Sequence, residues 1–136
     1  MFSHKSTKRV RYSETDKMGF LYYGNYPAFY EIGRVEMLRS LGLSYQKMED
    51  EMGILLPVVS LEIRYLRPAY YDDELTITTY LDDLPSKMIQ FRHEIYAPDK
   101  ELINKASIKL FFTQKEDNKR RSCPQELTDA LKPYFK

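Results

Sequence analysis

From residue 59 to residue 112, apolar and polar side chains alternate along the chain in four runs. The connections between the runs contain turn-forming residues such as Pro68, Asp82 and Pro98. Alternation of this kind is typical of strands that bury one face, and short turns join neighbouring antiparallel strands. The sequence therefore predicts an antiparallel meander of four strands, at 59–65, 75–81, 88–95 and 105–112.

An amphipathic helix is predicted ahead of the meander, at 26–41. Asn25 suits the N-cap of this helix, Pro27 suits its first turn, and Gly42 suits the position just after its last turn. Apolar residues recur at helical spacing and form one face: Tyr26, Phe29, Tyr30, Gly33, Met37 and Leu41.

Gly33 lies in the middle of this helix, where glycine costs up to about 1 kcal/mol relative to alanine. We therefore expect the helix backbone to approach closely the surface on which it packs. Glu31, Arg34 and Arg39 are expected largely away from the apolar face, and Glu31 and Glu36 are expected to be solvated salt-bridge partners of Arg34 and Arg39.

Three further elements complete the prediction. They are a first strand at 5–12, with Val10 and Tyr12 on one face, a short helix at 44–52 and a terminal helix at 124–135. The chain of 136 residues is long enough for one domain with its own core, and we expect a single domain over 1–136. One long helix and five strands form an α+β domain, and its simplest packing wraps the sheet around the apolar helix face.

Composition and the absence of certain motifs argue against several classes of function. A net charge of +1 argues against nucleic acid as the main partner. The only cysteine, Cys123, cannot form an internal disulfide, which favours the cytoplasm. No apolar run approaches the roughly 18 residues of a membrane span. The sequence has no His or Cys pair at metal-ligand spacing, no G-x-S-x-G and no phosphate-binding glycine pattern, so we expect no metal, no serine hydrolase and no nucleotide cofactor.

Two histidines are present, and neither is expected in a catalytic site. His93 shares the apolar face of its predicted strand, where a hydrogen-bonded core residue is the usual outcome. His4 is expected on a mobile terminus.

The stretch between the first strand and the helix contains carboxylates next to an aromatic run. Glu14 and Asp16 precede Gly19, and the run Phe20-Leu21-Tyr22-Tyr23 leads to the helix start. A carboxylate just upstream of a helix N-terminus lies beside free backbone N–H groups and a partial positive charge, which suit a developing oxyanion. From the residues alone, Asp16 is better explained as a loop aspartate in an Asx-turn or a cap, and only the family resemblance below favours a catalytic role.

This stretch resembles a family signature. The residues Glu14-Thr15-Asp16-Lys17-Met18-Gly19-Phe20-Leu21-Tyr22-Tyr23-Gly24-Asn25-Tyr26 are similar to those of hotdog-fold acyl-CoA thioesterases of the 4-hydroxybenzoyl-CoA thioesterase family. The rest of the chain agrees with the family in length and element order. The resemblance implies the hotdog fold with strand order 1-3-4-5-2. One branch of the family has His at the position of Tyr23, so no role of that His is carried over.

The resemblance also implies an activity, hydrolysis of a small acyl-CoA, and a catalytic pair. Asp16 would act as nucleophile or general base, and the backbone N–H of Tyr23, helped by that of Gly24, would bind the thioester oxygen. Tyr22 and its aromatic neighbours would admit an aromatic acyl group, although short aliphatic groups fit the signature equally well. Glu14 is expected to be structural.

The coenzyme A part of the substrate requires cations for its phosphates. Lys87 is the first candidate, and Arg64 and Arg67 near the end of the second strand are the others; each is equally explained as a solvated surface charge. No cofactor is expected, because coenzyme A belongs to the substrate. An exposed edge strand invites pairing, and the family pairs hotdogs edge to edge, so we expect a homodimer or homotetramer. A hotdog dehydratase and a non-catalytic acyl-thioester-binding domain remain the alternatives.

Overall fold

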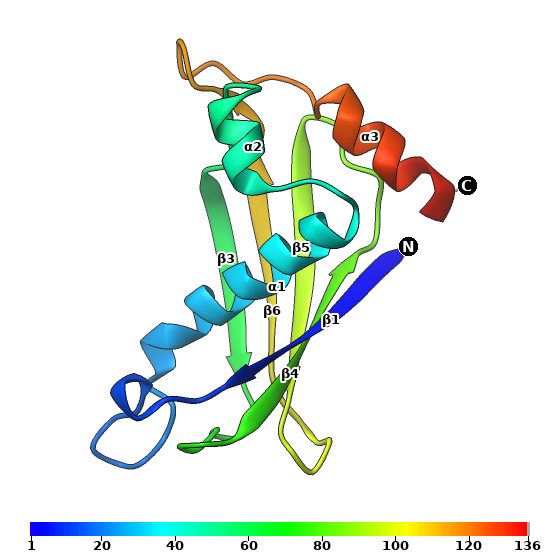
Figure 1. Cartoon of the computed structure of the whole chain (residues 1–136). Coiled ribbons are helices and arrows are strands. Elements are labelled where there is room, and N and C mark those ends of the chain that lie inside the picture. The colour runs from blue at the N-terminus through cyan, green and yellow to red at the C-terminus, as the bar shows by residue number, and fades with distance from the viewer. Residues whose placement is uncertain (136) are drawn as a thin grey trace.

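The computed structural model describes residues 1–135 and shows a five-stranded antiparallel sheet with one long helix lying across one face (Figure 1). The sheet order is β1-β4-β5-β6-β3. The five strands in chain order give the order 1-3-4-5-2, as predicted: β1 Phe2–Arg9, β3 Val58–Tyr65, β4 Glu74–Leu81, β5 Met88–Tyr96 and β6 Leu102–Phe111. The last residue of the predicted domain, Lys136, lies outside the described residues.

The helices are α1 Tyr26–Ser40, α2 Tyr45–Asp50 and α3 Gln125–Leu131. A second, two-stranded sheet pairs β2 Ile54–Leu55 with β7 Thr113–Gln114. Short 3₁₀ turns at Tyr12–Glu14, Tyr23–Asn25 and Lys132–Tyr134 complete the chain. The predicted helices and strands are therefore present, with shifted ends and the small β2–β7 pair in addition.

The first strand was predicted too late in the sequence. β1 begins at Phe2 opposite Leu81 and its ladder ends at Arg9, so His4 lies within a paired strand and not on a mobile terminus. After the strand, Val10 exchanges backbone hydrogen bonds with the loop before β4, and the chain turns away from the sheet. Tyr12 therefore does not share the burial of Val10, and it is 80% exposed.

The close approach predicted at Gly33 is confirmed. A Cβ on Gly33 would lie 2.3 Å from the Thr79 hydroxyl oxygen and 3.0 Å from a methyl carbon of Ile77, both on β4. No side chain fits in this space, so the glycine allows α1 to lie directly against the sheet.

The two ends of α1 are fixed in different ways. Gly42 has a positive φ of 81°, and the N–H of Leu43 donates to the carbonyl of Leu38 at 3.0 Å, which makes the C-terminal glycine cap that was predicted. Asn25 occupies the N-cap position, as predicted, but its side chain does not cap the helix. A 3₁₀ turn precedes the helix and takes Asn25 into helical backbone, and its side-chain amide donates to the Glu14 carbonyl at 2.9 Å.

Arg34 is the main exception to the predicted polarity of α1. It is 5% exposed, because α2 folds back beside it, and its Nε donates to the Tyr45 hydroxyl at 3.3 Å. Glu36 and Arg39 form the exposed ion pair that the sequence predicted. The helix therefore buries one cation that its sequence periodicity placed on the polar face.

Candidate active site

Asp16 is fixed in a tight turn before α1. Its Oδ1 accepts the N–H groups of Met18 at 2.9 Å and Phe20 at 3.1 Å, and its own N–H donates to the Phe20 carbonyl at 2.8 Å. Gly19, with φ of +83°, provides the left-handed backbone that closes the turn. The Asx-turn expected as an alternative is thus present. It uses Oδ1 alone, and Oδ2 accepts from no donor within residues 1–135.

Glu14 holds this loop to the start of the helix, as its predicted structural role requires. Its carboxylate accepts from the Lys8 ammonium at 2.9 Å and from the Arg11 N–H at 2.7 Å. Its carbonyl accepts from the Tyr22 N–H and from the Asn25 side chain, both at 2.9 Å. These four bonds fix the position of the loop relative to α1.

Two backbone N–H groups are free where the helix begins. The first N–H groups of any helix have no intrahelical acceptor. Those of Tyr23 and Gly24 find no other acceptor in the described chain, whereas their neighbours Tyr22 and Asn25 both donate. The helix dipole adds a partial positive charge at this end. The start of α1 can therefore donate to an anionic oxygen.

Local packing also explains why position 24 is a glycine. A Cβ on Gly24 would lie 2.6 Å from a ring carbon of Tyr22, which covers it. The Tyr22 ring in turn packs on Tyr23, with 4.8 Å between ring centroids.

A pocket of about 270 Å³ lies beside the turn and the helix start. The walls include Asp16, Phe20, Tyr23, Tyr26, Tyr65 and Arg67. The structure thus brings together three of the predicted site residues, Asp16, Tyr23 and Arg67. Neither Tyr22 nor Gly24 is part of its lining, although both adjoin Tyr23.

Tyr65 is a pocket residue that the sequence analysis did not identify. Its hydroxyl donates to the Tyr23 carbonyl at 2.9 Å, and its ring meets the ring of Tyr26 edge to face at 5.2 Å. This contact ties the end of β3 to the start of α1. The sequence pattern that could have identified Tyr65 is its alternation with Leu61 and Ile63, which placed it on the buried face of the strand.

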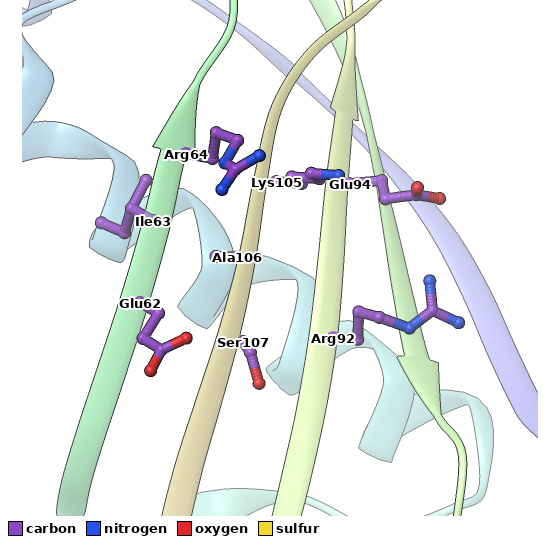
Figure 2. A pocket seen from close by; sticks show the side chains of 8 residues that line it. All are labelled: Glu62, Ile63, Arg64, Arg92, Glu94, Lys105, Ala106 and Ser107. Carbon is purple, nitrogen blue, oxygen red and sulfur yellow. The ribbon is translucent and has the colours of Figure 1, made fainter.

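The two candidate arginines differ in position. Arg67 lines the pocket, but its guanidinium is paired with Asp99 and Glu101 of the β5–β6 turn, with both Asp99 oxygens at 3.1 Å. Arg64 lies on the opposite face of the sheet next to Lys105 (Figure 2). There it lines a broad, open hollow of about 510 Å³ with charges of both signs, so Arg64 is separated from Asp16 by the sheet.

Lys87 is far from the pocket within one chain. It lies in the turn after β4, whereas the pocket is near the beginning of that strand. Eight residues of strand span about 25 Å. Within one chain, Lys87 and Asp16 are therefore separated by about the length of β4.

His93 is a core residue, as predicted. It is fully buried, its Nδ1 lies 3.1 Å from the Thr79 hydroxyl, and its ring stacks on Tyr30 at 5.0 Å. Burial and the nearby charge of Arg34 lower the pKa of His93 to about 3, so the ring is neutral at physiological pH. It does not line the pocket.

Within residues 1–135, no group of three or more His, Cys, Asp or Glu side chains could hold a metal ion. None of the described helices is both long enough and apolar enough to cross a membrane.

Residues 10–131 match the thioesterase-like superfamily. The chain belongs to this superfamily. A relative from Bacillus subtilis (strain 168), named putative acyl-CoA thioesterase YneP, is 35% identical over 119 residues, which cover 88% of this chain and 86% of the relative. The acyl-CoA thioester hydrolase YbgC of Escherichia coli O157:H7 is 31% identical, with 91% of this chain and 92% of the relative covered.

Solved structures agree with these relatives. The DHNA-CoA thioesterase from Staphylococcus aureus superposes with a TM-score of 0.89 at 28% identity, and the match covers 98% of this chain and 89% of the other. A hypothetical protein from Aquifex aeolicus gives a TM-score of 0.87 at 29% identity, covering 94% and 98%. The predicted hotdog fold and the predicted class of enzyme, an acyl-CoA thioester hydrolase, are confirmed.

Proposed function

We propose that this enzyme hydrolyses a small acyl-CoA in the pocket between Asp16 and the start of α1. One observation supports the proposal above all. The Asp16 carboxylate is held in its turn through Oδ1, and its Oδ2 accepts no hydrogen bond within residues 1–135. It borders the same pocket as the start of α1, where the N–H groups of Tyr23 and Gly24 are free. The thioester oxygen would accept from Tyr23 and Gly24, and these donors would favour the negative oxygen of a tetrahedral intermediate over the neutral carbonyl.

Asp16 has one of two roles in this proposal. It attacks the carbonyl carbon and forms a mixed anhydride that water then cleaves, or it takes a proton from the water that attacks. In both routes the thiolate of coenzyme A leaves without a strong general acid. The reaction needs no cofactor, because coenzyme A enters as part of the substrate.

A panel of acyl-CoAs incubated with a thiol reagent tests the reaction. We expect free coenzyme A and free acid, measured together. The panel includes aromatic as well as short aliphatic acyl groups, since one relative at 24% identity is named a 1,4-dihydroxy-2-naphthoyl-CoA hydrolase. A change in hydration state without coenzyme A release would support a dehydratase, and binding alone would support a non-catalytic domain. The buried, neutral His93 is unsuited to the acid–base pair of a dehydratase.

We further propose that the enzyme is a homodimer, or a tetramer of such dimers, and acts in the cytoplasm. β3 is an edge strand, and Val58 and Val59 on it are about half exposed. An open edge with apolar side chains pairs readily with another strand. Antiparallel pairing of β3 with its copy, about a twofold axis perpendicular to the sheet, would give one continuous sheet with both α1 helices on the same face. The cytoplasmic location rests on the single cysteine.

Light scattering at micromolar concentration is expected to give the mass of a dimer or tetramer. The variant Val59→Glu places a charge on the paired edge and should reduce the mass by weakening the β3–β3 contact, while the nearly isosteric Val59→Thr should not. A monomeric wild-type enzyme would refute the proposed assembly.

The same dimer gives Lys87 a position near a substrate. Met88 at the start of β5 pairs with Phe111 of β6, and the neighbouring Leu110 of β6 pairs with Val58 of β3. Lys87, which precedes Met88, is therefore at the Val58 end of the sheet. Pairing of β3 with its copy brings this end to the Tyr65 end of the other chain, where the other pocket lies. Lys87 would then meet the nucleotide part of coenzyme A from the neighbouring chain.

We expect Lys87→Ala to raise KM for acyl-CoA by up to about 5-fold and to leave kcat unchanged, since a screened lysine–phosphate contact contributes about 1 kcal/mol or less. The effect should shrink as salt is added. Steady-state kinetics at low and high ionic strength measure it, with Lys115→Ala in an exposed loop as control. An unchanged KM at low ionic strength removes Lys87 from the site.

A further inference from the structure

A second hollow, of about 260 Å³, lies between α1 and α2 on the helix side of the sheet. Arg34 is the buried charged residue in its lining, Glu31 and Glu49 are its acidic residues, and Leu56 and Val58 belong to its apolar wall. None of these residues contributes to the pocket at Asp16.

The guanidinium of Arg34 is incompletely satisfied. Its Nε donates to Tyr45, and its central carbon lies 5.9 Å from the centre of the Phe91 ring. Nη1 is buried and finds no acceptor within residues 1–135. A buried charged donor without an acceptor is costly, so this site favours any ligand that supplies an oxygen.

The proposed dimer would place this hollow next to the active-site pocket of the other copy. Val58 borders the hollow at one end of β3, and Tyr65 borders the active-site pocket at the other end. Antiparallel pairing of two β3 strands puts the Val58 end of one copy against the Tyr65 end of the other. Both cavities lie on the helix side of the sheet, so they would meet on the same face.

We propose that Arg34 of one copy determines the acyl specificity of the site formed by Asp16 of the other copy, by donating to an oxygen at the far end of the acyl group. This proposal rests on the function proposed above. Glu31 and Glu49 would repel a second carboxylate on the acyl group. A neutral hydroxyl or carbonyl oxygen accepts from Arg34 without that repulsion, and a hydroxyl can also donate to Glu31. The preferred acyl group therefore carries a neutral oxygen substituent.

Matched substrate pairs test the proposal. The pairs are 4-hydroxybenzoyl-CoA with benzoyl-CoA, and 3-hydroxybutyryl-CoA with butyryl-CoA. We expect the wild-type enzyme to prefer the oxygenated member of at least one pair in kcat/KM. Arg34→Met should reduce that preference by about 10-fold, as expected for the loss of a charged hydrogen bond. Arg34→Lys, which keeps a cationic donor, should retain part of it.

Arg39→Met is the matched control, because Arg39 lies on the same helix in an exposed ion pair. It should leave the preference unchanged. If Arg34→Met does not fold, Tyr45→Phe removes the hydroxyl that positions the guanidinium and should reduce the preference by about 3-fold. A wild-type enzyme without preference, or a folded variant (Arg34→Met, or Tyr45→Phe in its place) with the full preference, overturns the proposal.

Mixed dimers test whether Arg34 acts across the interface. Asp16→Asn and Arg34→Met subunits are combined and allowed to exchange. A mixed dimer has one site with both changes and one site with neither, so about a quarter of all sites become wild type in a random mixture. Adding Asp16→Asn protein should therefore raise the rate of the Arg34→Met enzyme on the oxygenated substrate and restore its preference. No rise would mean that Arg34 does not serve the other copy's site.

The outcomes also separate the two proposals. Full activity of Asp16→Asn contradicts the proposed function. An inactive Asp16→Asn together with an unchanged preference in Arg34→Met contradicts only the role of Arg34.

Discussion

Asp16→Asn is expected to lower kcat on the best acyl-CoA by at least about 100-fold and to change KM little. Asparagine keeps the Oδ1 atom, which accepts from Met18 and Phe20, so the turn should persist. The change removes the negative charge and the basicity that either role of Asp16 requires. Steady-state kinetics give kcat and KM, and circular dichroism with thermal unfolding confirms that the fold is kept.

The matched control is Asp129→Asn on α3, where the aspartate is exposed and accepts only from Gln125 of the same helix. It should retain wild-type kcat. Near-normal kcat in Asp16→Asn would show that the catalytic assignment is wrong, and Glu31, then Glu36, would be tested next.

Single turnover in isotopic water distinguishes the two roles of Asp16. If Asp16 forms an anhydride and water attacks its aspartyl carbonyl, the label enters the Asp16 carboxylate. If Asp16 acts as a base, the label enters the product acid directly. Mass spectrometry of the peptide that contains Asp16 measures the first outcome.

Most of the sheet could be predicted because its determinants are local. Alternation fixes which face of each strand is buried, and short turns fix its neighbours. This is why Leu61 and Ile63 pack on the core while Glu62 and Arg64 lie on the outer face. The strand order came from the family resemblance, because several orders agree with the same pattern of strands.

Burial by distant segments could not be predicted in this way. Periodicity placed Arg34 on the polar side of α1, and only the return of α2 over the helix buries it. The prediction for Tyr12 was wrong in the opposite direction: it shared a strand face with Val10 in the prediction, but it is exposed because the chain leaves the sheet at Val10. In both cases tertiary contacts decide the result, and a local pattern does not contain them.

The candidate site likewise contains residues that are close in sequence, which could be predicted, and residues that only tertiary structure brings together. Asp16 and the free N–H groups of Tyr23 and Gly24 lie within nine residues of chain, so their proximity followed from the sequence. Tyr65 reaches the site from the end of β3, and its hydrogen bond to Tyr23 spans 42 positions. The role of Lys87 rests on the proposed dimer and stays a prediction.

Gly33→Ala is expected to lower the free energy of unfolding by about 2 kcal/mol, although alanine is the better helix former. The new methyl would lie 2.3 Å from the Thr79 hydroxyl oxygen. That hydroxyl belongs to a stiff, β-branched side chain and is hydrogen-bonded to the His93 ring. α1 would have to move away from β4, and overpacking of this kind costs more than the gain in helix propensity. Chemical denaturation at one fixed protein concentration measures the change, since assembly contributes to stability.

Two further variants show whether the clash is the cause. Ala28→Gly, at an exposed position on the same helix, should cost about 1 kcal/mol, which shows that alanine is preferred where space is free. Thr79→Ala removes the hydroxyl that the new methyl meets, so the double variant with Gly33→Ala should be more stable than the sum of the two single effects, by about 1 kcal/mol or more. Additive effects, or a Gly33→Ala protein more stable than wild type, would mean that a methyl group fits between α1 and β4. Glycine at position 33 would then need another explanation.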